Sequence, residues 1–174
     1  GWRAYNGDQM PPGWKIVDGI LTFTTAQILE GDYDYKGSRD IIYGAEEFDN
    51  FELYVEWNIP KGGNSGIFYH LKEGYDGPPV VSPEYQLLDD ENYAEIHNYE
   101  LKDWQLTAAD YAMHVPDTCQ KVLYPPGQWN SSRIVFTPEN VEHWLNGKKV
   151  LSFVPWSEDW YQRRNSGKWN NAPD

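Results

Sequence analysis

The chain has 174 residues, and 14 Lys and Arg against 27 Asp and Glu give it a formal net charge of −13. A surface this acidic repels phosphate backbones and argues against nucleic acid as a partner. No apolar run approaches the ~20 residues of a membrane span. Aromatic residues make up 16% of the chain, a composition typical of all-β sandwiches that hold flat ligands. The length favours one domain over residues 1–174.

The first half of the chain contains five segments with the apolar runs or alternation of β-strands. They are residues 19–25, 40–44, 51–59, 66–71 and 84–88. Alternation is clearest at 51–59, where Phe51 and every second residue to Ile59 are apolar, as in a half-buried antiparallel strand.

Residues 92–113 lack this alternation, and we predict a long loop with a helical turn. Loops of that length in compact domains are usually functional or disordered. Trp104, Tyr111 and His114 lie in or just after the loop, where an exposed aromatic ring could stack on a sugar. Scattered aromatic residues more often belong to a core, so both roles stay open.

The second half of the chain predicts a three-stranded meander, with strands at 132–136, 141–145 and 149–154. The segment 137–140 and the Asn146-Gly147 dipeptide separate these strands, and Asn-Gly is a typical two-residue hairpin turn. Many short strands with Gly and Pro turns indicate two packed antiparallel sheets, a jelly roll or a related sandwich.

The stretch EYQLLD, residues 84–89, carries the first candidate chemistry. On a regular strand Glu84 and Gln86 share one face. Asp89 joins that face only if a β-bulge inserts a residue near 87–88, and such bulges re-aim side chains beside active sites. Without the bulge, this is an edge strand with a solvated polar face, and Asp89 begins an acidic turn.

The stretch GGNSGIFYHL, residues 62–71, supplies a glycine inside a predicted strand. Gly66, Phe68 and His70 then share a face, and a strand glycine leaves room for a ligand or another backbone. His70 could act as a base, donate to a ligand or serve the structure. Further along, Glu142 and His143 lie on opposite faces of one predicted strand.

Several site types are absent from the sequence. There is no phosphate loop, dinucleotide fingerprint, HExxH or GxSxG motif. Cys119 is the only cysteine, so no intrachain disulfide can form and the redox compartment stays open. Four dispersed histidines predict no definite metal site, although a histidine with carboxylates could hold one divalent ion.

Four stretches together resemble a known family: FDNFELYVEWNIPKGGNSGIFYHL, SPEYQLLDDEN, AADYAMHVP and GQWNSSRIVFTPENVEHWLNGKKV. They resemble the 3-keto-disaccharide hydrolase domain family over nearly the whole chain, in order and at matching spacing. The resemblance implies a bacterial, extracytoplasmic protein that is periplasmic, secreted or a lipoprotein. It also implies a concanavalin A-like jelly-roll sandwich with a glycoside or oligosaccharide on its concave face.

Related retaining glucanases carry a bulged ExDxxE strand, which EYQLLD resembles with altered chemistry. The resemblance therefore implies cleavage of a sugar oxidised at C3, by proton removal at C2, elimination of the C1 group and hydration. It leaves a conventional retaining glycosidase and a non-catalytic lectin-like module as alternatives. Family members usually have a strand before GW and two more after residue 174, so we expect this chain to be part of a longer protein.

The candidate residues follow from these patterns and the resemblance. The predicted catalytic residues are Glu84, Asp89 and His143, whose carboxylates and imidazole suit proton transfer. Arg133 or a bound metal could stabilise the enolate oxygen. The predicted substrate-binding residues are Gln86, His70, Asn64, Trp104, Tyr111, His114, Arg133 and Trp144.

Overall fold

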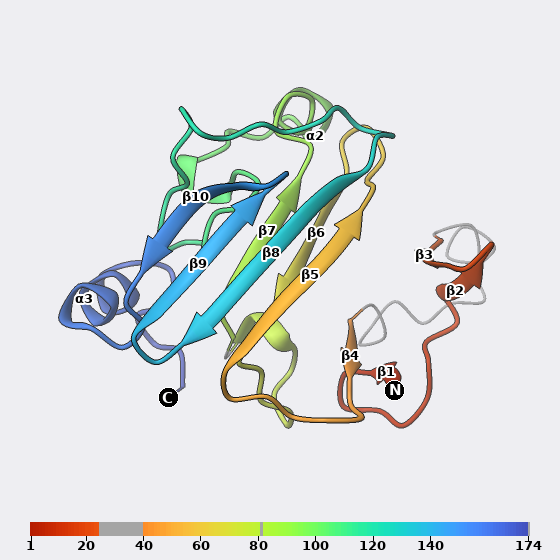
Figure 1. Cartoon of the computed structure of the whole chain (residues 1–174), viewed down its shortest axis with the longest axis horizontal. Helices are drawn as coiled ribbons and strands as arrows, with labels where there is room; N and C mark the ends of the chain where they lie inside the picture. Colours follow the sequence, from red (N-terminus) through yellow and green to blue (C-terminus); the bar gives the residue numbers. More distant parts are fainter. Residues whose placement is uncertain (25–39, 81, 174) are drawn as a thin grey trace. The chain divides into compact units, whose positions relative to one another are not determined.

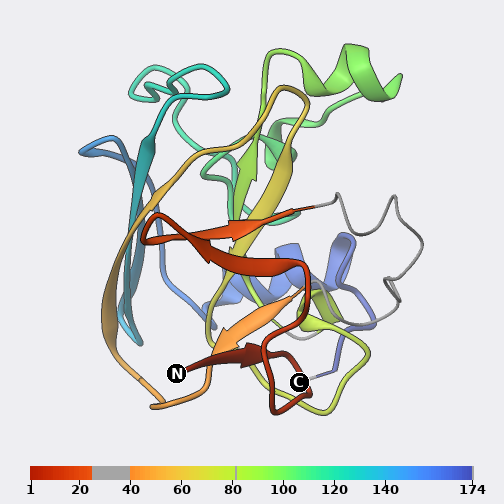
Figure 2. The same cartoon turned by 90° about the vertical axis from the view of Figure 1, so that its right-hand side faces the viewer.

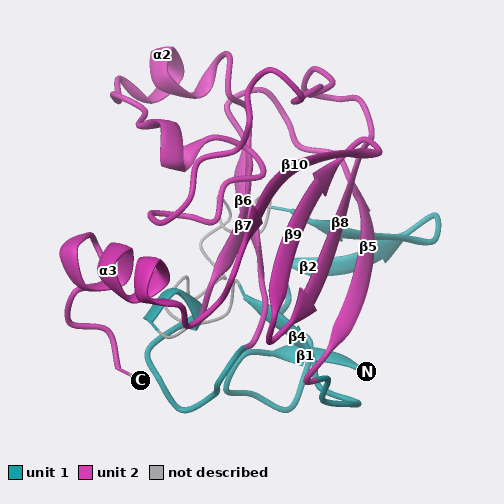
Figure 3. Ribbon diagram, turned by 60° about the vertical axis from the view of Figure 1, so that its left-hand side comes forward, with its two compact units in different colours: residues 1–48, 71–81 teal, residues 49–70, 82–174 magenta. Residues whose placement is uncertain are grey.

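The computed structural model describes residues 1–24, 40–80 and 82–173. The chain forms two compact units, coloured separately in Figure 3. Unit 1 comprises Gly1–Phe48 and Leu71–Val81, and unit 2 comprises Asp49–His70 and Ser82–Asp174. Each unit is described by itself below. No helix in the described ranges is long and apolar enough to cross a membrane.

Unit 1 contains two small antiparallel pairs and one turn of 3-10 helix. Strand β1 (Trp2–Ala4) pairs with β4 (Ile41–Tyr43), β2 (Trp14–Val17) pairs with β3 (Ile20–Phe23), and η1 spans Pro78–Val80. Asp18 and Gly19 both have positive φ in the β2–β3 turn, as a type I′ hairpin requires. The predicted strands 19–25 and 40–44 thus appear in shorter form, and residue 25 lies outside the described residues.

Unit 2 is built on a four-stranded antiparallel sheet in the order β10-β9-β8-β5. Its strands are β5 (Phe51–Trp57), β8 (Asn130–Thr137), β9 (Asn140–Leu145) and β10 (Lys148–Phe153). The predicted meander is confirmed, and Asn146 and Gly147 both take the left-handed conformation that its second turn needs. Burial alternates along β5 and β8, so each strand turns one face toward a core.

A second layer covers the inner face of this sheet. It contains β6 (Asn64–Phe68) and β7 (Glu84–Leu88), which lie behind the four-stranded sheet in Figure 1 and beside it in Figure 2. Tyr85 and Leu87 of β7 pack in one core cluster with Ile134 and Phe136 of β8. The all-β, two-layer antiparallel prediction is therefore confirmed, while the concanavalin A-like assignment stays a prediction.

The loop after β7 is irregular and returns to pair with that strand. It contains α2 (Tyr93–His97) and η2 (Asp103–Gln105), in keeping with the predicted loop with a helical turn. Residues 109–111 then lie along the free edge of β7, where the Gln86 amide donates to the Ala109 carbonyl (3.1 Å) and the Tyr111 amide to the Glu84 carbonyl (3.0 Å). The last helix of unit 2 is α3 (Glu158–Ser166).

Candidate functional site

The outer face of β7 gathers polar side chains around a glycine. Tyr85 and Leu87 point into the core, so Glu84 and Gln86 lie on the opposite side of the strand, where Glu84 is half-buried and Gln86 is buried. Register places Gly66 opposite Gln86 and Asn64 opposite Leu88 on that same side. A Cβ added at Gly66 would collide with the Glu84 carboxylate, so this side chain lies over the glycine.

An aromatic group adjoins these polar residues. Tyr85 and Asp110 form an antiparallel β-bridge, so the neighbouring residues Glu84 and Tyr111 also lie opposite each other. The ring of Trp104 meets Tyr111 edge-on at 5.3 Å, and the indole of Trp169 donates to the Tyr111 carbonyl (3.2 Å). We call Asn64, Gly66, Glu84, Gln86 and Tyr111 the β7 face. Carboxylate, amide and aromatic groups together suit a sugar, which needs hydrogen bonds and an apolar ring partner.

Within the β7 face Glu84 is the one carboxylate, because Asp89 does not reach it. The register runs unbroken from Asn64–Leu88 to Phe68–Glu84, so the bulge needed for Asp89 is absent from β7 and that prediction is wrong. Asp89 instead accepts hydrogen bonds from the Gly62 amide (2.8 Å) and from the Asn92 side chain (2.9 Å).

These bonds give Asp89 a structural role. Burial alone would raise its pKa, but the hydrogen bonds from Gly62, Asn92 and Glu91 outweigh burial and lower the pKa of this carboxyl. Asp89 thereby joins the turn before β6 to the start of α2 as an anion. The alternative without a bulge, in which Asp89 begins an acidic turn, is therefore the one that the structure shows.

His143 lies in the core between the two layers, fully buried, and not on the β7 face. Its Nδ1 is 2.9 Å from the Ala108 carbonyl and its Nε2 is 3.0 Å from the Tyr69 hydroxyl. Because a carbonyl can only accept, Nδ1 carries the proton and Nε2 accepts from Tyr69. Burial lowers the pKa of His143 to about 4, so the imidazole is neutral at pH 7.

A second buried pair was missed in part by sequence reasoning. Asp110 accepts from Nδ1 of His114 at 2.7 Å, and both side chains are buried on the inner side of the 109–111 segment. Burial raises the pKa of Asp110 against the opposing hydrogen bond from His114. Nε2 of His114 has no hydrogen-bond partner and lies 3.5 Å from Asp159 of α3. In the sequence, the four-residue spacing of Asp110 and His114 in DYAMH was the one signal that could have indicated this pair.

His70 does not continue the face of β6. Strand β6 ends at Phe68, and His70 has φ +51°, so the predicted strand 66–71 is wrong at its end. A left-handed residue turns the chain out of a strand. The exposed imidazole stacks on Phe136 at 5.2 Å and meets Trp156 at the same distance.

Arg133 and Trp144 lie on the outer face of the four-stranded sheet, away from β7. The Arg133 Nε donates to Glu52 (2.6 Å), and the guanidinium lies 4.9 Å from the Trp144 ring centroid. The Trp144 indole donates to Glu142 (2.8 Å). Arg133 is therefore not placed to stabilise charge beside Glu84. No group of three or more His, Cys, Asp or Glu in residues 1–24, 40–80 and 82–173 could hold a metal ion.

Comparison with known proteins decides the family. The model of the 3-keto-alpha-glucoside-1,2-lyase-like domain matches residues 1–173. This chain belongs to that family. The resemblance to the 3-keto-disaccharide hydrolases is thereby confirmed.

The chain is also similar to individual bacterial proteins. It is 35% identical over 173 residues to a 3-keto-disaccharide hydrolase of Bacteroides thetaiotaomicron, an alignment that covers 92% of this chain and 57% of the relative. A crystal structure from Parabacteroides distasonis, named "putative glycosyl hydrolase", is 44% identical with a TM-score of 0.86 and covers 100% of this chain and 76% of its own. A second, with the same name and source, is 25% identical with a TM-score of 0.63, at 88% and 72% coverage.

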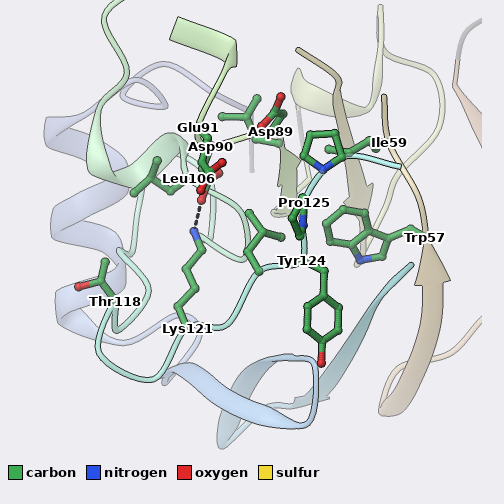
Figure 4. A pocket seen from close by; sticks show the side chains of 13 residues that line it. Trp57, Ile59, Asp89, Asp90, Glu91, Leu106, Thr118, Lys121, Tyr124 and Pro125 are labelled. Atoms are coloured by element: carbon green, nitrogen blue, oxygen red, sulfur yellow. Dashed lines mark hydrogen bonds and ion pairs between the residues drawn. The ribbon is translucent and has the colours of Figure 1, made fainter. Parts of the chain in front are cut away.

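Unit 2 also has a cavity of about 270 Å³ beyond the end of β7. Figure 4 shows Trp57, Ile59 and Pro125 on one side and the acidic segment 89–91 on the other. Two of these three carboxylates already have protein partners. Asp89 accepts the hydrogen bonds from Gly62 and Asn92, and Asp90 forms an ion pair with Lys121 and accepts from the Thr107 amide (2.9 Å). Glu84 lines neither wall, so the β7 face is the stronger candidate for chemistry.

Proposed function

We propose that this domain is a carbohydrate-active hydrolase that cleaves glycosides already oxidised to a ketone at C3. Family membership supports the substrate class. The observation that supports the mechanism is the β7 face, where Glu84 lies over Gly66 beside Gln86 and Tyr111. A glycine at this position makes room for the Glu84 carboxylate, which occupies the place that a side chain at residue 66 would take.

One base is sufficient for such a substrate. A C3 ketone acidifies the proton on C2, so a carboxylate can remove it and generate an enolate. The enolate then expels the C1 group, and water adds to the resulting double bond. In this proposal Glu84 is the base, the exposed Asn64 holds a hydroxyl group, and Tyr111 with Trp104 contacts the ring. Gln86 is buried and accepts from the Leu87 amide (3.1 Å), so it supports the strand beside the base.

Conventional retaining hydrolysis fits the geometry less well. It uses two carboxyl groups ~5–5.5 Å apart, one as nucleophile and one as acid. The described β7 face offers Glu84, while both oxygens of Asp89 serve Gly62 and Asn92. A non-catalytic sugar-binding module would use the same aromatic rings and would leave the substrate unchanged.

The test compares one sugar in two oxidation states. The full-length protein is incubated in D₂O with a 3-keto glucoside and, separately, with the parent glucoside, and aglycone release is followed. We expect release from the ketone alone, with deuterium at C2 of the product. Comparable cleavage of the parent glucoside would favour a retaining glycosidase. Binding without cleavage of either sugar would favour a lectin-like module.

A further inference from the structure

The C-terminal part of unit 2 brings a cation to the β7 face. Nζ of Lys168 lies 4.4 Å from the Tyr111 ring centroid and 4.8 Å from that of Trp169. Tyr111 is itself opposite Glu84. Tyr111 thus contacts Lys168 and lies opposite Glu84, the candidate base, although Lys168 and Glu84 are far apart in the sequence.

Several contacts fix this segment in place. The Trp169 indole donates to the Tyr111 carbonyl (3.2 Å), and a guanidinium nitrogen of Arg163 donates to the Met113 carbonyl (3.2 Å). Gly167 approaches closely too, since a Cβ there would lie 3.7 Å from the Ala112 carbonyl oxygen. The end of α3 and the turn after it therefore bind two carbonyls of this segment, those of Tyr111 and Met113, and lie close to the Ala112 carbonyl between them.

The neighbours of Lys168 are aromatic rings and not carboxylates, so its positive charge is not neutralised by an ion pair in the described residues. Lys102, near the same loop, instead pairs with Glu100 at 3.3 Å. Aromatic faces attract an ammonium group without neutralising it. Lys168 is exposed, so its ammonium group can reach a ligand bound on the β7 face.

We propose that Lys168 is the catalytic residue that stabilises the enolate, a role that rests on the proposed function. As Glu84 takes the C2 proton, the C2–H pair forms a C2=C3 bond and the carbonyl π pair moves to the C3 oxygen. The Lys168 ammonium binds this oxyanion. Its collapse restores C3=O, forms C1=C2 and breaks the C1–O bond, and the leaving oxygen takes a proton from solvent. Water then adds across C1=C2.

The experiment isolates enolate formation. It uses the 3-keto form of 1,5-anhydroglucitol, which has one proton on C2 but no exocyclic leaving group on C1, and follows the exchange of that proton with D₂O by NMR. The full-length wild type is compared with Lys168→Met, Lys168→Arg and the matched control Lys148→Met, whose exposed lysine begins β10 on the other sheet. Aglycone release from a 3-keto glucoside and the dissociation constant of the parent glucoside are measured alongside.

We expect Lys168→Met to slow both exchange and cleavage by ~100-fold, the usual loss on removing one oxyanion donor. Lys168→Arg should retain more activity than Lys168→Met, Lys148→Met should match the wild type, and binding of the unoxidised glucoside should change little. Exchange and cleavage by Lys168→Met within threefold of wild type would overturn the role of Lys168 alone. A wild type that neither exchanges nor cleaves would overturn the proposed function as well.

Discussion

The two outer faces of unit 2 contain similar residues arranged in different ways. On the four-stranded sheet Glu52 pairs with Arg133 (2.6 Å) and Glu142 with Lys149 (3.0 Å), while both cations lie within 6 Å of the Trp144 ring centroid. On the β7 face a carboxylate lies over a glycine, and the neighbouring cation contacts aromatic rings.

The difference separates a structural surface from a candidate site. Charges that neutralise one another on a strand surface stabilise little and leave nothing to act on a ligand. On the β7 face Gly66 stabilises its strand poorly but makes room for the Glu84 carboxylate. Acid, cation and aromatic residues therefore do not mark a site by their presence alone, because the same three kinds of residue also cover the four-stranded sheet.

The sharpest test of this comparison removes one carboxylate from each face. Glu84→Gln keeps the shape of the side chain but removes the base, so cleavage of a 3-keto glucoside should slow by ~10³-fold, within the usual range for a general base. Glu142→Gln, on the other face, should stay within twofold of wild type. Initial rates at equal concentrations of folded protein measure both. Equal losses in the two variants would end the distinction between the faces.

The next largest effect concerns the core between the faces. His143 has a pKa of about 4 in the folded protein against 6.5 in its ordinary state, so between these values the unfolded chain binds the extra proton. The stabilisation is complete above pH 6.5 and is lost as the pH falls through 4. The expected loss in the free energy of unfolding is about 3 kcal/mol, measured by urea denaturation at pH 7, 5.5 and 4.

His143→Gln is the control for this pH dependence, because an amide can donate to Ala108 and accept from Tyr69 without titrating. Asp110, whose pKa burial raises, contributes in the opposite direction at the acid end of the range. The decisive quantity is therefore the difference between wild type and variant. If that difference is the same at pH 7 and pH 4, His143 is not the buried neutral group described here.

Much of the fold could be predicted from local patterns. Alternation located β5 and β7, and the Asn146-Gly147 turn joined β9 and β10 at the predicted place. Strands β1 and β2 were not predicted, although β3 and β4, which are just as short, were located by the apolar runs in residues 19–25 and 40–44. The end of β6 was missed because the left-handed φ of His70 depends on tertiary contacts with Phe136 and Trp156.

The site was harder to predict for the same reason. A period of two placed Glu84 and Gln86 on one face, but it could not show that His143 would meet the Tyr69 hydroxyl in the core. Nor could it bring Lys168 to Tyr111, because a contact across 57 residues is set by how α3 packs and not by local sequence. Residue type and spacing suggest chemistry, and only packing assigns it.

A smaller effect is expected where Asp89 joins its neighbours. Asp89→Ala removes the acceptor for the Gly62 and Asn92 groups, two of them backbone amides. The cost should be about 2 kcal/mol in the free energy of unfolding, as for hydrogen bonds to a charged group. Cleavage by the folded fraction should stay within threefold of wild type. A loss of activity as large as that of Glu84→Gln would return Asp89 to the catalytic residues.

The smallest effect should come from a change on the outer face of the four-stranded sheet. Arg133→Met removes the ion pair with Glu52 and the contact with Trp144, but its long apolar side chain still covers the tryptophan ring. Exposed ion pairs of this kind contribute little, so the melting temperature should shift by less than about 3 °C. Activity toward a 3-keto glucoside should be unchanged, because the residue lies on the sheet opposite β7. A loss of cleavage with an unchanged melting temperature would mean that the four-stranded face also binds substrate, and that mutual pairing of charges does not mark a surface as structural.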